Sequence, residues 1–495
     1  MGDQASSRLS MVRWPAGGRS MTTAVNHYGR HGDLVDAAIA KLKLHFGERL
    51  TTATAVRDQH GHDVSWHPSY PPDAVVFPDT ADEVSRIVAT CHAFDVPVIP
   101  FGTGTSCEGH VAALMGGICI DLSRLDRILT IQPDDMTATV EAGVTRKRLN
   151  AELRDTGLFF PVDPGADASL GGMASTRASG TNAMRYGTMK DNVVSLGVVL
   201  PNGDRIRTAS HARKSAAGYD LTRLWVGSEG TLGIVTDVTV KLHPIPDHVV
   251  AISASFSTLE QAVGFVLVAT KLTDSLARIE LLDELQVEAV NSYSKLSLPV
   301  EPTLFIELHG SRAAVEAALP FIETEAHAAG ASRFDTAVSA EARGRLWQAR
   351  HDIWWANLAL RPGASALPTD SCVPVSRLVE AILAAKADVR DLGLLAPICG
   401  HVGDGNFHLC VLFDPADPDE RQRVETLTKR LAARAIALQG TSTGEHGIGH
   451  GKMAALVAEH GPAIRVMAAI KRAVDPHNIM NPGKIFNLAE APPFN

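Results

Sequence analysis

Residues 100–109 read Pro100-Phe-Gly-Thr-Gly-Thr-Ser-Cys-Glu-Gly109 and follow an apolar segment at 96–100. Glycine has no Cβ, so a backbone rich in it can approach a charged ligand closely, and its successive N–H groups can form an anion site. The spacing differs from the Gly-x-Gly-x-x-Gly motif of nicotinamide dinucleotide folds, and the segment that follows reads as a strand instead of a helix. The loop alone is also compatible with a simple turn. Its hydroxyl donors are Thr103, Thr105 and Ser106.

The segments around this loop predict a strand–helix–strand unit. A short apolar strand is expected at 74–77, and Thr80 with Glu83 three residues later is typical of a capping box at the start of a helix. Apolar residues then recur at helical spacing until Cys91, and 96–100 reads as the next strand. Further strands are expected at 117–121, 138–141, 193–200 and 233–242.

The character of the chain changes near Pro244 and Pro246. Expected strands at 249–256, 303–309 and 407–413 alternate with expected helices at 258–270, 313–329, 376–391, 419–438 and 463–474. This pattern predicts an α+β region with an antiparallel sheet. We therefore divide the chain into an N-terminal tail with a helix at 33–46 (1–66), a first domain (67–247), a second domain (248–475) and a C-terminal segment (476–495).

Composition limits the class of protein. The chain has 495 residues, enough for two or three domains, and its formal net charge of −9 argues against a nucleic-acid surface. Its six cysteines include no Cys-x-x-Cys pair, which disfavours a zinc ribbon, and no run of eighteen apolar residues predicts a membrane span. We interpret the first twenty residues as a disordered tail, with Met21 as an alternative start, in preference to an organelle-targeting segment.

Two further glycine-rich runs accompany the first loop. One extends from Pro161 through Gly171-Gly-Met173 to Tyr186-Gly187, and the other is Gly227-Ser-Glu-Gly-Thr-Leu-Gly-Ile-Val235. Over residues 67–487 the chain resembles the FAD-binding PCMH-type flavoproteins of the vanillyl-alcohol oxidase superfamily, in particular the D-lactate dehydrogenase (cytochrome) and glycolate oxidase subunit branch. The resemblance implies a two-subdomain FAD-binding fold with an α/β cap domain built on an antiparallel sheet.

The resemblance also implies which residues hold the cofactor. Residues 100–106 would wrap the FAD pyrophosphate, the 163–187 run would contact the ribityl chain and flavin ring, and residues 229–234 would lie along the adenosine. Some relatives attach FAD through a histidine in the first loop; that position matches Thr105, so non-covalent FAD is expected, although His110 lies nearby. The implied contacts are Pro100, Gly102, Thr103, Gly104, Thr105, Ser106, Pro164, Gly165, Asp167, Gly171, Gly172, Thr176, Ser179, Gly180, Asn182, Tyr186, Glu229, Gly230, Gly233, Ile234 and Asn481.

A histidine–glutamate set lies in the second domain. His401-Val-Gly-Asp-Gly-Asn-Phe-His408 is followed later by Gly444-Glu-His-Gly447. Asp404-Gly405 favours a turn, which would let both imidazoles converge, whereas a continuous strand would separate them. Two imidazoles and Glu445 can bind a divalent cation, or they can be hydrogen-bonded histidines beside an exposed acid. In the matched family these three positions are metal ligands, and zinc or manganese would fit.

The resemblance assigns the remaining chemistry. His446 is the expected base, because an imidazole titrates close to the working pH. Arg350 is expected to anchor the substrate carboxylate through its two-donor fork, with a surface ion pair as the alternative. Asn406 adds a polar contact near the substrate.

These parts predict FAD-dependent oxidation of a small D-2-hydroxy acid to the 2-oxo acid. Relatives that oxidise D-2-hydroxyglutarate carry a lysine just before the position of Asp370, where this chain has Thr369, so a monocarboxylate such as D-lactate is favoured. The alternatives are a glycolate oxidase subunit, a D-2-hydroxyglutarate dehydrogenase, a non-catalytic flavin-binding subunit and an alkylglycerone-phosphate synthase. The sequence leaves open a homo-oligomer and an acceptor that is a cytochrome, a quinone, an electron-transfer flavoprotein or oxygen. It predicts a cytoplasmic location, or a mitochondrial one in a eukaryote.

Overall fold

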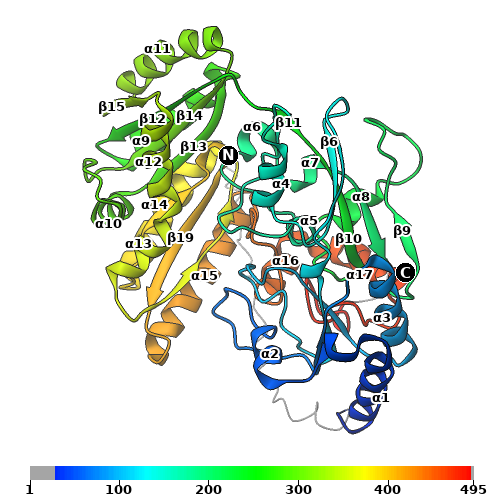
Figure 1. Cartoon of the computed structure of the whole chain (residues 1–495). Coiled ribbons are helices and arrows are strands. Elements are labelled where there is room, and N and C mark those ends of the chain that lie inside the picture. Colours follow the sequence, from blue (N-terminus) through cyan, green and yellow to red (C-terminus); the bar gives the residue numbers. More distant parts are fainter. Residues whose placement is uncertain (1–27, 492–495) are drawn as a thin grey trace, which may run out of the picture.

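The computed structural model describes residues 28–491, so the interpretations of residues 1–20 and of Met21 lie outside the described range. Two halves of the chain lie side by side (Figure 1). The part coloured from green through yellow to light orange (residues 248–413) carries the largest sheet, and the part coloured from blue through cyan to green carries two smaller sheets. The orange-red to red part after residue 437 returns to the other half of the molecule, which carries the smaller sheets.

The first small sheet has the strand order β1-β2-β4-β3. The predicted strand–helix–strand unit is present, but β4 lies between β2 and β3 and is parallel to both. Buried apolar side chains of α1 and α3 belong to the same core as this sheet. The bounds are α1 Tyr28–Phe46, β1 Leu50–Thr51, α2 Thr54–Gln59, β2 Ala74–Val76, α3 Ala81–Ala93, β3 Val98–Phe101 and β4 Ile118–Asp121.

The start of α3 differs in part from its prediction. Thr80 caps the helix, because its hydroxyl accepts a hydrogen bond from the backbone N–H of Glu83. The predicted capping box is wrong, however, since the Glu83 carboxylate accepts hydrogen bonds from Arg49 and from the backbone N–H of Asp79. An arginine that pairs with both carboxylate oxygens competes well with a single backbone donor.

The second small sheet is antiparallel, with the order β5-β6-β10-β8-β9. Its outer strands β5 and β9 carry mostly exposed or half-exposed residues. No apolar run predicts β9, which reads Arg-Ile-Arg, whereas β5 contains the short apolar segment Ile128-Leu-Thr-Ile131, which was not predicted as a strand. The bounds are β5 Ile128–Gln132, β6 Thr137–Glu141, α4 Arg146–Leu153, β7 Leu158–Phe159, α5 Leu170–Thr176, α6 Ala183–Tyr186, α7 Met189–Asn192, β8 Val193–Val199, β9 Arg205–Arg207, α8 Leu221–Trp225, β10 Ile234–Lys241 and β11 His243–Pro244.

The large sheet begins at His248 and has the order β15-β12-β14-β13-β18-β19-β16, with β17 paired to β19. All of its pairs are antiparallel, which confirms the prediction. Helices α9, α11, α14 and α15 share the main core with it, and α10, α12 and α13 form a second cluster. The bounds are β12 His248–Phe256, α9 Leu259–Leu272, β13 Leu276–Leu282, α10 Glu284–Ser294, β14 Thr303–Gly310, α11 Arg312–Ala328, β15 Ala331–Ala337, α12 Ala340–His351, α13 Ile353–Leu360, β16 Ser365–Pro368, β17 Ser371–Cys372, α14 Leu378–Asp391, β18 Ile398–Gly400, β19 Asn406–Phe413 and α15 Pro418–Ala437.

The C-terminal segment joins the first half again. After α16 (Met453–His460) and α17 (Ile464–Val474), residues 479–481 run beside β3, where Val98 exchanges backbone hydrogen bonds with Ile479 and Asn481 at 2.8 Å each. Length and composition alone would let 453–474 cross a membrane, so the prediction of no such segment overlooked this candidate. In the fold, Gly461 and Pro462 separate α16 from α17, and both helices contribute side chains to a small core with Phe486.

The six cysteines are all unpaired, and four of them are buried. The buried cysteines therefore pack as small apolar residues of the core.

Candidate active site

The first glycine loop faces the segment that leads into α5. A Cβ on Gly102 would lie 2.6 Å from the Ser169 hydroxyl, and one on Gly172 would lie 3.1 Å from the same oxygen. Ser169 is 2% exposed, and its hydroxyl has no hydrogen-bond partner within residues 28–491. A buried hydroxyl without a partner is rare unless a ligand satisfies it. The missing side chains at both glycines and this free donor fit an anionic group such as the FAD pyrophosphate, although the sequence did not single out Ser169.

The second glycine-rich run is folded around Asp163. Its carboxylate accepts hydrogen bonds from the Thr181 hydroxyl at 2.7 Å and from the Asn182 backbone N–H at 3.0 Å. The Asn182 side-chain amide donates to the Pro161 carbonyl at 3.0 Å, while its buried Oδ1 has no partner in the described chain. Asn182 therefore retains a free acceptor for a donor group on the cofactor.

Several predicted cofactor residues use their side chains within the protein. The Glu229 carboxylate accepts hydrogen bonds from the backbone N–H groups of Ile448 and Gly449 at 2.7 and 2.8 Å. Asn481 donates to the carbonyls of His110 and Glu229, and the Tyr186 hydroxyl is 2.8 Å from Nδ1 of His309 in the large sheet. These side chains connect separate segments of the molecule, so we assign them a structural role. Their backbone atoms can still contact FAD.

His110 is buried between acids. Burial lowers the pKa of His110, but the carboxylates of Glu229, 3.3 Å away, Asp63 and Glu108 together outweigh burial and raise this pKa above its ordinary value. His110 is therefore a buried residue of the loop, paired with Glu229.

The other predicted FAD contacts occupy the same glycine-rich segments. The hydroxyls of Thr103 and Thr105 are 3.0 Å apart, and Thr176 back-bonds to the carbonyl of Gly172 at 3.1 Å. Asp167 accepts a hydrogen bond from the Lys147 backbone N–H at 3.2 Å. The remaining residues are Pro100, Gly104, Ser106, Pro164, Gly165, Gly171, Ser179, Gly180, Gly230, Gly233 and Ile234.

Two histidines and one glutamate converge beside the end of β18. His401 follows β18, a turn at Gly405 with φ of +79° reverses the chain, and His408 lies on β19, where it pairs with Cys399. Nε2 of His401 and Nε2 of His408 are each 3.2 Å from the same Glu445 oxygen, Oε1. The three ligand atoms lie within 4.8 Å of one another. This geometry agrees with the predicted turn and not with a continuous strand.

The Nδ1 atoms of His401 and His408, which point away from Glu445, each have a hydrogen-bond partner. Nδ1 of His401 is 2.6 Å from the Glu280 carboxylate, and Nδ1 of His408 is 2.9 Å from the Thr369 carbonyl. When Nδ1 carries the proton for these acceptors, Nε2 presents its lone pair to the centre of the cluster. The donor set of two imidazoles and one carboxylate, oriented in this way, fits a divalent cation.

Asp370 fixes the loop that carries Glu445 and His446. Its carboxylate accepts hydrogen bonds from the backbone N–H groups of both residues at 2.9 Å, from the Thr443 hydroxyl at 2.9 Å and from the Asn406 amide at 2.7 Å. Burial opposes ionisation, but favourable electrostatic interactions with the imidazoles of His446 and His408 and with the Lys452 ammonium together outweigh it and hold the pKa of Asp370 well below its usual range. Sequence reasoning missed this role because nothing local distinguishes Asp370 from an ordinary loop aspartate.

The expected catalytic side chains surround the cluster. The His446 ring stacks on that of His408, with centroids 5.2 Å apart, and its buried Nδ1 has no partner in the described part of the chain. Burial lowers the pKa of His446 to about 4, so the ring is neutral near pH 7 and can accept a proton. The Asn406 amide donates to Asp370 and to the Ser371 carbonyl, and only its Oδ1 stays free.

Arg350 lies at the end of α12 and is only 14% exposed in its side chain, so the alternative of a surface ion pair is wrong. Its Nε donates to Glu280 at 2.8 Å, while its two terminal nitrogens form no hydrogen bond with any described residue. The free edge of the guanidinium group is therefore available to a carboxylate.

Two family models match this chain. Residues 72–209 match the FAD binding domain, and residues 245–485 match the C-terminal domain of FAD linked oxidases. A protein of Danio rerio named probable D-lactate dehydrogenase, mitochondrial, is 51% identical over 90% of each chain. The chain belongs to the FAD-linked oxidase family.

Other FAD-linked oxidases support this assignment. The D-lactate dehydrogenase [cytochrome], mitochondrial, of Arabidopsis thaliana is 43% identical over 97% of this chain and 85% of its own. A glycolate oxidase subunit of Bacillus subtilis is 36% identical over 89% of this chain and 94% of its own. Among solved structures, 4-ethylphenol oxidase of Gulosibacter chungangensis superposes with a TM-score of 0.76 at 19% identity, covering 92% of this chain and 98% of that one. The family and the fold agree with the predicted PCMH-type flavoprotein, and FAD is the cofactor of this oxidoreductase.

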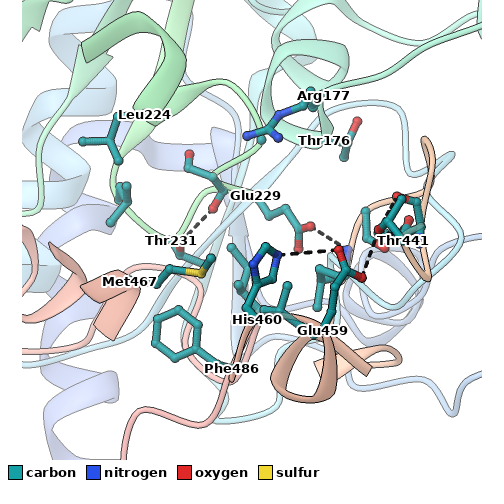
Figure 2. A pocket seen from close by; sticks show the side chains of 18 of the residues that line it. Thr176, Arg177, Leu224, Glu229, Thr231, Thr441, Glu459, His460, Met467 and Phe486 are labelled. Carbon is teal, nitrogen blue, oxygen red and sulfur yellow. Dashed lines mark hydrogen bonds and ion pairs between the residues drawn. The ribbon is translucent and has the colours of Figure 1, made fainter. Parts of the chain in front are cut away.

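A cavity of about 600 Å³ lies between the segment after α8 and the C-terminal helices (Figure 2). Its wall includes Glu445 and Gly447 of the site loop, and apolar side chains such as Leu224, Met467 and Phe486. Of the predicted cofactor residues, Thr176 and Glu229 line it, but the first glycine loop does not. The cavity therefore adjoins the loop that carries Glu445 without including the loop at 100–106.

The close approach of Gly102 to Ser169 makes a prediction about cofactor binding. Replacing Gly102 with valine should weaken FAD binding, because the new side chain would meet the Ser169 hydroxyl where the cofactor is expected. Overpacking costs about 1–3 kcal/mol, equivalent to about 5- to 150-fold in the dissociation constant. The flavin absorbance that stays with the protein after desalting measures the effect. Gly344→Val, at an exposed glycine of α12 with no atom within 4 Å of its Cβ position, is the control. Full FAD retention by the Gly102 variant would contradict this placement of the loop.

Proposed function

We propose that this FAD-linked oxidase oxidises D-lactate to pyruvate. The observation that carries the proposal is the buried, unpartnered Nδ1 of His446 beside the cluster of His401, His408 and Glu445. The two relatives named D-lactate dehydrogenase, at 51% and 43% identity over at least 90% of this chain, support the substrate. Bound FAD supplies the electron-accepting ring for the hydride that leaves the substrate carbon.

The metal site would consist of His401, His408 and Glu445, with zinc or manganese as the ion. A divalent ion held there would act as a Lewis acid that makes the substrate hydroxyl easier to deprotonate. Glu280 and the Thr369 carbonyl keep the two imidazoles aimed at this position.

His446 would take the proton of the substrate hydroxyl. The His446 backbone N–H donates to Asp370, and the His446 ring stacks on the His408 ring. These two contacts set the position of the ring before the substrate binds. The free edge of Arg350 would bind the substrate carboxylate, and Oδ1 of Asn406 would accept a hydrogen bond from the substrate. Holding the carbon that loses hydride in one orientation accounts for a large part of the rate in such reactions.

The preference for a monocarboxylate has a local basis. Thr369 occupies the position at which relatives that oxidise D-2-hydroxyglutarate carry a lysine. Its hydroxyl accepts a hydrogen bond from the Leu409 N–H, and its carbonyl oxygen accepts one from Nδ1 of His408. It therefore offers no cation to a second carboxylate, and an unpaired buried carboxylate costs affinity. D-2-hydroxyglutarate is accordingly the less favoured substrate, and glycolate is the alternative that the Bacillus subtilis relative supports.

The acceptor and the location are also proposals. The word cytochrome in the name of the Arabidopsis thaliana relative favours a cytochrome over a quinone, an electron-transfer flavoprotein or oxygen. The same name and that of the Danio rerio relative favour a mitochondrial over a cytoplasmic location. We keep a homo-oligomer as an open alternative.

Anaerobic titration of the oxidised protein tests the function directly. D-Lactate is expected to bleach the flavin absorbance at the lowest concentration, glycolate and L-lactate at much higher ones, and D-2-hydroxyglutarate least of all. A flavin that no 2-hydroxy acid bleaches would favour the non-catalytic flavin-binding subunit. Bleaching by D-2-hydroxyglutarate before D-lactate would overturn the substrate assignment.

A further inference from the structure

One buried carboxylate connects the two halves of the proposed site. Glu280 lies on β13 and is 0% exposed. Its Oε1 is 2.6 Å from Nδ1 of His401, and its Oε2 accepts the Nε hydrogen of Arg350 at 2.8 Å. Each oxygen thus has one partner, and each partner has a different role in the proposed reaction.

The strand register explains why Glu280 reaches both partners. Leu282 pairs with Cys399 and Leu281 with Gly400, so the next position in this antiparallel pair sets Glu280 opposite His401, where β18 ends. Arg350 approaches from α12, whose earlier residue Trp347 donates to Glu307 on the neighbouring strand β14. The helix is therefore attached to the sheet by two buried carboxylates, and only Glu280 also contacts a proposed metal ligand.

The contact with His401 acts on the metal position. A carboxylate on Nδ1 keeps the proton there and leaves the Nε2 lone pair free, 3.2 Å from the Glu445 oxygen. Carboxylates that hold a ligand histidine in this way also make the imidazole a better donor, and their loss typically weakens metal binding by about 10- to 100-fold.

The contact with Arg350 acts on the substrate position. The hydrogen bond from Nε of Arg350 to Glu280 fixes the plane of the guanidinium group. The two terminal nitrogens form no hydrogen bond with any residue of 28–491, so they can bind a carboxylate. A fork held in one plane loses less freedom when it binds a carboxylate. Glu280 itself cannot bind the anionic substrate, because both of its oxygens are occupied and its charge is negative.

We propose that Glu280 is a shared positioning residue, which orients the proposed metal ligand His401 and the proposed carboxylate anchor Arg350 through one side chain. This inference rests on the proposed function for the roles of those two partners. It extends that function by making metal affinity and carboxylate affinity depend on the same group.

The test replaces Glu280 with glutamine, which keeps the shape but offers one acceptor oxygen instead of two. Chelator-stripped protein is titrated with Mn²⁺, and the bound ion is counted after desalting. We expect the affinity for Mn²⁺ to fall by about 10- to 100-fold. The inhibition constant of pyruvate, measured with the metal site saturated, should rise at least about fivefold, since Arg350 loses a charged hydrogen-bond partner.

Glu307→Gln is the matched control, because Glu307 is a buried carboxylate that holds the same helix through Trp347 and contacts neither His401 nor Arg350. It should lower the melting temperature without changing the affinity for Mn²⁺. Unchanged Mn²⁺ and pyruvate affinities in the Glu280 variant, or equal changes in both variants, would overturn the proposal.

Glu280→Asp provides a second variant in case the glutamine protein does not fold. It keeps the charge but is one methylene shorter, so it cannot reach both partners at their present distances. We expect at least one of the two affinities to fall about threefold or more, whereas wild-type values for both would refute the shared role. The Mn²⁺ titration needs no turnover, so it stays decisive even if D-lactate proves not to be the substrate.

Discussion

Flavin reduction by D-lactate should stop when His446 is replaced by alanine, while FAD stays bound. The His446 ring stacks on the His408 ring of the cluster. Its buried Nδ1 has no hydrogen-bond partner among the described residues, so it can accept the proton of the substrate hydroxyl. Loss of a positioned base typically lowers the rate about 10²- to 10⁴-fold. The measurement is the anaerobic rate of flavin bleaching after rapid mixing, with bound FAD checked by absorbance.

His327→Ala is the control for this variant, since His327 is an exposed histidine in the last turn of α11 that does not line the cavity. It should bleach at the wild-type rate. If the His446 variant also reduced its flavin at that rate, His446 would not be the base, and another group would have to accept the hydroxyl proton.

Replacing Glu445 with glutamine should remove both the metal and the activity. Within residues 28–491, the Glu445 oxygen is the only carboxylate atom 3.2 Å from both Nε2 atoms, and a neutral amide is a much weaker ligand for a divalent cation. A Lewis-acid contribution of several kcal/mol corresponds to about 10²- to 10³-fold in rate. Metal analysis and flavin reduction are measured on the same preparation.

Two controls separate this effect from general damage. Wild-type protein stripped with a chelator should lose activity and regain it with Mn²⁺ or Zn²⁺, whereas the Glu445 variant should not regain it. Glu420→Gln, which changes a buried acid paired with Arg361 at the start of α15, should retain its metal. A metal-free wild-type protein with full activity would rule out the metal-assisted reaction.

The cavity next to the site loop shows why these variants must be tested for bound FAD. Glu445 and Gly447 line it together with Glu229, whose carboxylate holds the backbone of Ile448 and Gly449 (Figure 2). A substitution that displaces this loop would change contacts with the FAD half as well as the metal cluster. Retained FAD absorbance therefore distinguishes a chemical effect from a displaced loop.

Local patterns in the sequence determined the general plan of this protein. The glycine-rich runs, the Asp404-Gly405 turn and the helix start at Thr80 depend on neighbouring residues, and the structure confirms each of them. The alternation of strands and helices after residue 248 was likewise enough to predict an antiparallel sheet. Strand β9 was missed because a mostly exposed edge strand needs no apolar run, whereas β5 was missed although it contains Ile128, Leu129 and Ile131.

Only the tertiary structure decided which polar side chains act together. Glu280, Asp370 and Ser169 have no local signature, yet Glu280 is 121 residues from His401 and Asp370 is 75 residues from Glu445 in the chain. Conversely, Glu229 and Asn481 were assigned to the cofactor, but their side chains bind backbone groups of distant segments. The reason is physical: a buried polar group must be paired wherever the fold brings a partner, and sheet register and loop packing choose that partner without regard to distance along the chain.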